Sequence, residues 1–62
     1  MSVDEIARRY IAGDFPGLEG KSLPAALFEL SMVYDLDRSV ILKAIERAQD
    51  EAQARDYAEL IA

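Results

Sequence analysis

The stretch from residue 26 to residue 45 constrains the fold more than any other, because its apolar residues follow helical spacing on both sides of a short polar break. In that break, Asp35 and Asp37 flank one apolar residue, Leu36. Asp tolerates a positive φ better than most other residues. It is also a good N-cap for a helix that follows. The stretch therefore predicts two helices joined by a tight turn.

The N-terminal residues predict a further helix over residues 3–12. Ser2 and Glu5 have the spacing of a capping box, and Gly13 is a suitable left-handed C-cap. The apolar residues between these ends form one helical stripe, which consists of Val3, Ile6, Ala7, Tyr10 and Ile11.

Residues 14–21 are expected to form a connection with a turn at Pro16, and Phe15 and Leu18 are expected to cover the end of the core. A helix over residues 23–34 follows, with Ser22 as its cap. Its buried stripe is expected to contain Leu23, Leu27, Leu30 and Tyr34, with Ala26 and Val33 beside it. Phe28 and Met32 lie off this stripe. Either a bundle covers them or they contact another chain.

The last helix is expected over residues 37–49, and residues 50–61 either continue it or form a short fourth helix. A second apolar stripe in that segment contains Ala54, Tyr57, Ala58 and Ile61. At about 100° per residue, Ile61 points roughly 200° away from Ile41, so one straight helix cannot pack both stripes on the same neighbour. We therefore expect Tyr57, Leu60 and Ile61 to contact another chain, together with Phe28 and Met32.

These patterns predict an all-α fold. The chain is expected to be a single domain, residues 1–62, in the form of a small three-helix or four-helix bundle with a helix-turn-helix and a long C-terminal helical segment. A chain of 62 residues buries only roughly 60% of the surface that its unfolded form exposes, so its stability as a monomer is marginal. It has no Cys for disulfides and no His for a zinc site. Oligomerisation is the remaining source of stability, so we expect a dimer.

The net charge of −5 and a pI near 4.4 disfavour DNA as a partner, because nucleic-acid-binding domains are usually basic. The longest apolar run falls far short of the roughly 20 residues that span a bilayer. Asp4 and Glu5 stand where a signal peptide would carry basic residues. We therefore expect a cytoplasmic protein that does not bind a membrane.

Residues 26–48 resemble the helix-turn-helix of bacterial and phage regulators, including those of the GntR type. Asp35 departs from the pattern, since Gly is usual there. The matching positions are the apolar residues Leu30, Tyr34 and Leu36, the small residues Ser31 and Ala44, the capped start Asp37-Arg38-Ser39, and the buried pair Ile41 and Ile45. The resemblance implies that Arg38, Ser39, Leu42 and Lys43 face a DNA major groove, with Arg47 nearer the phosphates.

No catalytic site, metal site, cofactor or small-molecule substrate is evident in the sequence. Ser39 has no His to activate it, and the carboxylates are not arranged for acid–base chemistry. We expect a non-enzymatic, DNA-associated regulator. The alternative is an acidic protein-binding module on the same scaffold, such as a phage-encoded inhibitor, an antitoxin or an assembly subunit. The aliphatic residues Val40 and Leu42, if they point outward, favour the alternative.

Overall fold

The computed structural model describes residues 1–61 apart from the side chain of Ile61, and its α-helices are α1 (Val3–Ala12), α2 (Leu23–Tyr34) and α3 (Arg38–Ile61). A short 3-10 helix, η1 (Pro16–Leu18), lies between α1 and α2. The predicted all-α class is confirmed. The first two helices begin and end where the sequence predicts. Residues 50–61 continue the third helix, so the alternative of a separate fourth helix is wrong for this segment.

The ends of α1 follow from its capping residues. The Ser2 side chain accepts a hydrogen bond from the Glu5 backbone N–H at 3.2 Å, which satisfies one of the donors that a helix start leaves free. At the other end Gly13 has a φ of 79°. Its N–H donates to the Tyr10 carbonyl at 3.1 Å. Gly adopts this left-handed conformation without steric cost, so the chain leaves the helix there.

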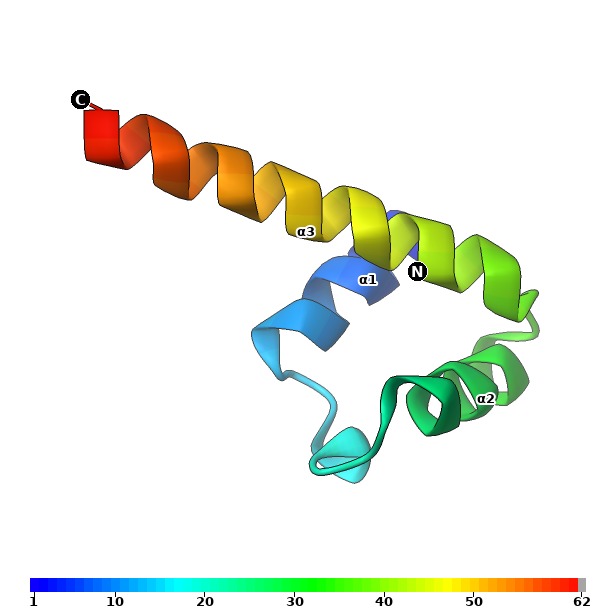
Figure 1. The fold of residues 1–62 in the computed structure, drawn as a ribbon. Helices are drawn as coiled ribbons and strands as arrows, with labels where there is room; N and C mark the ends of the chain where they lie inside the picture. The colour runs from blue at the N-terminus through cyan, green and yellow to red at the C-terminus, as the bar shows by residue number, and fades with distance from the viewer. Residues whose placement is uncertain (62) are drawn as a thin grey trace.

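The core lies on the first half of α3, which both other helices share. Ile41, Ala44 and Ile45 of α3 are buried with Ile6 of α1 and Leu30 of α2. Both α1 and α2 pack on α3 more than on one another. In Figure 1 they lie on the same side of α3, beneath its N-terminal half. Each of these helices therefore keeps one side that no other helix covers.

Two expectations for α2 are wrong. The sequence predicts Leu23 in the buried stripe and Val33 beside it, yet 40% and 72% of these residues are exposed. The buried residues of α2 are Ala26, Leu27 and Leu30, and at about 100° per residue Val33 lies at the edge of that arc. Because α1 packs on α3 and leaves this side of α2 open, the edge position is not covered. Ser22 stands at the N-cap of α2 as expected, but its side chain makes no capping hydrogen bond.

The C-terminal part of α3 extends beyond the rest of the molecule (Figure 1). Ala48 and Ala52 are half-buried, whereas every side chain of residues 53–60 is exposed. We refer to residues 53–60 as the overhang. The molecule measures 41 × 22 × 19 Å as a result. Among the described residues, no helix has the length and apolarity needed to cross a bilayer.

Shortening one buried side chain of α3 should destabilise the fold measurably. Ile41 is fully buried, so Ile41→Val is expected to lower the free energy of unfolding by about 0.5–1.5 kcal/mol. Its neighbour Val40 is 43% exposed, so Val40→Ala should change that free energy by less than about 0.5 kcal/mol. Urea unfolding followed by circular dichroism measures both. Equal effects of the two variants would contradict the placement of the core.

Candidate functional site

The connection between α2 and α3 is a tight turn of three residues, 35–37, and positions the start of α3. Asp35 has φ 53° and ψ 48°, a left-handed conformation. Its N–H donates to the carbonyl of Ser31, and the N–H of Leu36 donates to the same oxygen at 3.2 Å. One left-handed residue thus reverses the chain, and α3 begins three residues after Asp35. The positive φ that the sequence allows for Asp35 is therefore observed.

Small and apolar side chains allow the two helices to approach each other at this corner. The half-buried Ser31 donates its hydroxyl to the Phe28 carbonyl at 2.7 Å, within its own helix. Leu36 and Tyr34 are half-buried and pack against the core. The packing of Leu36 and Tyr34 against the core therefore holds the turn, together with the backbone hydrogen bonds to the Ser31 carbonyl.

Asp37 caps the start of α3 with its carboxylate. Its Oδ1 accepts hydrogen bonds from the backbone N–H and from the hydroxyl of Ser39, both at 2.8 Å. Its carbonyl accepts from the N–H of Ile41 at 3.2 Å. The hydroxyl and backbone donors of Ser39, and then the charge of Arg38, lower the pKa of Asp37 from its usual 3.8. The cap keeps a negative charge directly beside Arg38.

The solvent face at the start of α3 carries three of the five residues expected to contact DNA. Arg38, Ser39 and Lys43 are exposed. However, the Ser39 hydroxyl already donates to Asp37, so this oxygen can only accept from a ligand. At about 100° per residue, Glu46 falls within roughly 60° of both Ser39 and Lys43. It is exposed too. The face is therefore mixed in charge, with a cation on each side of Ser39.

Leu42 serves packing more than contact with a ligand. It is half-buried against the core, although the sequence placed it on the contact face. It lines an open apolar groove between the starts of α2 and α3, whose volume is about 350 Å³ and whose other lining residues are Leu23, Pro24, Leu27, Arg38 and Ser39. The expectation that Leu42 points outward is therefore only partly met. Val40, at 43% exposure, is the more accessible aliphatic residue.

Arg47 belongs to an ion pair that sequence spacing cannot reveal. Its Nη2 lies 3.1 Å from Oδ1 of Asp4, which is in the first turn of α1. The two residues are 43 positions apart. Both side chains remain more than half exposed, so the pair adds little to stability. It nevertheless partly neutralises the positive charge with which Arg47 could bind a phosphate.

The residues expected at an interface fall on two separate surfaces. Phe28 and Met32 are 53% and 69% exposed on α2. Tyr57 and Leu60 are 66% and 84% exposed on the overhang, and Tyr57 lies about 28 Å along α3 from Arg38. Figure 1 shows α2 and the overhang toward opposite ends of α3. The side chain of Ile61, which the sequence predicts beside them, lies outside the described residues.

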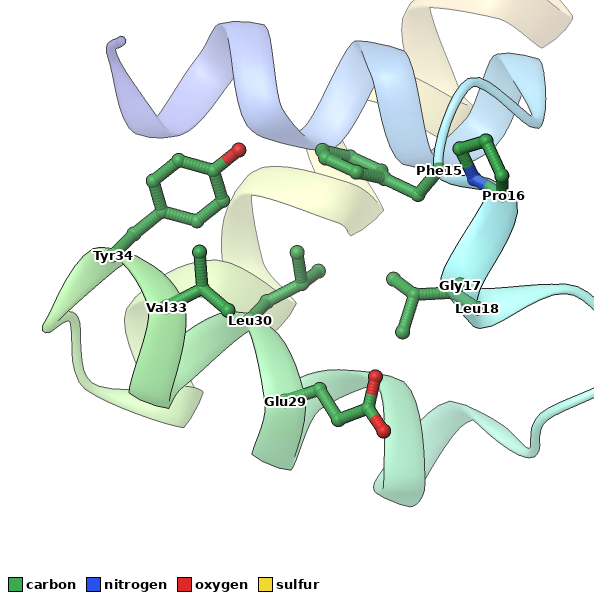
Figure 2. A pocket seen from close by; sticks show the side chains of 8 residues that line it. All are labelled: Phe15, Pro16, Gly17, Leu18, Glu29, Leu30, Val33 and Tyr34. Atoms are coloured by element: carbon green, nitrogen blue, oxygen red, sulfur yellow. The ribbon is translucent and has the colours of Figure 1, made fainter.

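The sequence did not reveal a pocket between η1 and α2, which we call the η1 pocket. It has a volume of about 200 Å³ and is lined by Phe15, Pro16, Gly17, Leu18, Glu29, Leu30, Val33 and Tyr34. Figure 2 shows the rings of Phe15 and Tyr34 above it and the aliphatic side chains around it. The two rings meet edge to face, with their centroids 6.4 Å apart. The expectation that Phe15 and Leu18 pack at the end of the core is confirmed. The signal that could have indicated the pocket was the apolar character of these loop residues.

No family model, curated protein or solved structure matches this sequence.

The Asp37 cap should make the stability of the fold depend on pH. Because the pKa of Asp37 is lowered in the folded chain, its charged form stabilises the fold above pH 3.8, and this contribution is lost as the pH falls through the folded pKa. Asp37→Asn can still accept the hydrogen bonds but does not titrate. Thermal unfolding should show a lower midpoint for this variant at neutral pH and a difference that disappears in acid. A difference that is independent of pH would contradict this role.

Proposed function

We propose that the chain is a small, non-enzymatic helix-turn-helix protein that associates with DNA as a dimer and acts as a regulator. The observation that carries this proposal is the start of α3, where Arg38 and Lys43 are exposed on a helix held by a tight turn and a capping residue. A helix presented in this way fits the major groove, with its first turns against the base edges.

Roles follow from the chemistry of each side chain. Arg38 is suited to bidentate hydrogen bonds with guanine, and it stands in the first turn of α3. Lys43 supplies charge to the phosphates, and Ser39 offers an acceptor to a base amino group. Arg47 reaches a phosphate only if it leaves Asp4. So few cations on an acidic chain predict weak binding, and a slope of log K against log salt of only about −0.9 for each phosphate that they neutralise.

An acidic protein-binding module is the second candidate. The net charge of −5 supports it, because a chain with this excess is attracted to basic protein surfaces and repelled by a polyanion. The exposed Val40 and the acidic Glu46 on the contact face support it as well. The two candidates differ in whether low salt strengthens the binding of duplex DNA.

Removing the two exposed cations at the start of α3, Arg38 and Lys43, should weaken DNA association. Fluorescence anisotropy with a random duplex at low salt should show binding by the wild type. Arg38→Ala/Lys43→Ala should weaken it at least tenfold and reduce the slope of log K against log salt by about 0.9 for each phosphate that the variant no longer neutralises. Arg9→Ala/Arg55→Ala removes the same charge from exposed positions away from the turn and is the matched control.

Equal weakening by the two double variants would show that only total charge matters, and would contradict a defined contact face. No binding by the wild type at low salt would reject the DNA proposal and leave the protein-binding module.

Freeing Arg47 should have the opposite effect. Asp4→Asn removes the partner of Arg47 and one negative charge, so DNA binding in the same assay should become tighter by about twofold to fivefold, the size of an exposed ion-pair effect. The control is Asp14→Asn, which changes the net charge equally but lies just after α1. An equal gain from both variants would show that Arg47 takes no part.

A further inference from the structure

Helix α2 is apolar on every side, although only one side of it is buried. Glu29 is the only charged residue among its twelve. A helix that is hydrophobic all round is normally enclosed by other elements. Here Phe28, Met32 and Val33 are more than half exposed, and we call these three residues the α2 outer face. An apolar surface of this kind is normally covered, and no other element of the described chain covers it.

The α2 outer face is continuous with the η1 pocket. Val33 belongs to both, and Figure 2 shows it on the α2 wall of the pocket. A cavity of about 150 Å³ with apolar walls accommodates a ring the size of benzene, so the η1 pocket, at about 200 Å³, can accept one aromatic side chain. The same helix thus carries a protruding phenyl group, Phe28, and a pocket of matching size.

The charge of this region permits contact between two identical chains. Each copy carries −5, so most orientations of two copies bring like charges together. Within α2 the only carboxylate is that of Glu29, which forms an ion pair with Lys21. The overhang, in contrast, carries Asp56 and Glu59 beside Tyr57 and Leu60. Self-association through α2 therefore meets less electrostatic repulsion than self-association through the overhang.

The exposed area is also larger than a solitary chain of this size requires. The accessible surface is 4565 Å², whereas a compact monomer of 6.9 kDa exposes about 4,000 Å². The exposed overhang, which gives the molecule its elongated shape, accounts for part of this difference. Area alone does not select the face, but the apolar character of α2 and its low charge do.

We propose that a second copy of this chain covers the α2 outer face, and that Phe28 of each copy enters the η1 pocket of the other. The interface is isologous, so one knob and one pocket per chain make two equivalent contacts. This names the contact surface of the dimer in the proposed function, and it holds whether or not the dimer binds DNA.

The reciprocal contact requires the two α2 helices to run in the same direction. At about 100° per residue, Phe28 and Val33 lie about 140° apart around α2, on either side of the line through Ala25 and Met32. A two-fold axis parallel to the helices brings the Phe28 side of one copy against the Val33 side of the other, with the two residues about 7.5 Å apart along the axis, a gap that the phenyl side chain has to bridge. An antiparallel pair would instead bring Phe28 next to Phe28.

Sedimentation equilibrium over a range from low to high micromolar concentration tests the interface. The wild type should dimerise, and Phe28→Glu should raise the dissociation constant of the dimer at least tenfold. Leu60→Glu adds the same charge to the overhang and should leave that constant within about threefold, because the overhang lies outside the proposed interface. Circular dichroism confirms that each variant remains helical.

A wild type that stays monomeric at high micromolar concentration would overturn the proposal. So would a dimer that Leu60→Glu disrupts and Phe28→Glu does not, because that result would move the interface to the overhang. Arg38→Ala/Lys43→Ala should keep the dimer mass, so failure to bind DNA and failure to dimerise are distinguishable.

Single cysteines test the direction of the helices, since the chain has none of its own. Ala25 and Met32 are both exposed on the line of contact and lie about 10 Å apart along α2. In a parallel pair each residue faces its own copy, so Ala25→Cys and Met32→Cys should both form a disulfide-linked dimer on mild oxidation. In an antiparallel pair at most one can, because a disulfide needs Cα atoms within about 7 Å. Cross-linking of only one variant, or of neither, would overturn the reciprocal insertion of Phe28.

Discussion

The fold depends on the first half of α3, which provides the surface on which both other helices pack. Ile41, Ala44 and Ile45 are buried there, and α1 and α2 reach the core through α3 more than through each other. Two helices on one support leave little room for a large core. The largest fully buried side chains are accordingly three isoleucines, Ile6, Ile41 and Ile45. Because burial of such side chains drives folding, the position of α3 relative to α2 matters more than any surface interaction.

That position is set by residues 35–37. Asp35 turns the chain, Leu36 packs inward and Asp37 caps α3. The same three residues place Arg38 at the first position of the helix. Structure and candidate function are therefore linked at this turn, because the cap that orients the helix also puts a negative charge beside its first cation. In the proposed function, the carboxylate of Asp37 would repel a phosphate that approaches Arg38, which is one physical reason for expecting weak DNA binding.

The arrangement around α3 also determines which apolar residues remain exposed. A third packing layer would have covered Phe28 and Met32, but no element of the described chain lies over them. The overhang is exposed for a different reason, since α3 is simply longer than the helices beneath it. The two exposed surfaces differ in chemistry. The surface on α2 is almost free of charge, whereas the overhang alternates apolar side chains with acidic and basic ones, as a solvated helix does.

Local signals in the sequence determined the helices, their caps and the turn, because capping and helical periodicity depend on residues within a few positions of each other. This is why Ser2, Gly13, Asp35 and Asp37 could be assigned without a structure. The tertiary structure alone decided the continuity of α3, the exposure of Val33, the η1 pocket and the pairing of Asp4 with Arg47. Each of these depends on which helix lies against which, and periodicity only defines the apolar side of a helix. The packing of α1 and α2 on one face of α3 therefore decided which apolar surfaces of the described chain stay exposed to solvent.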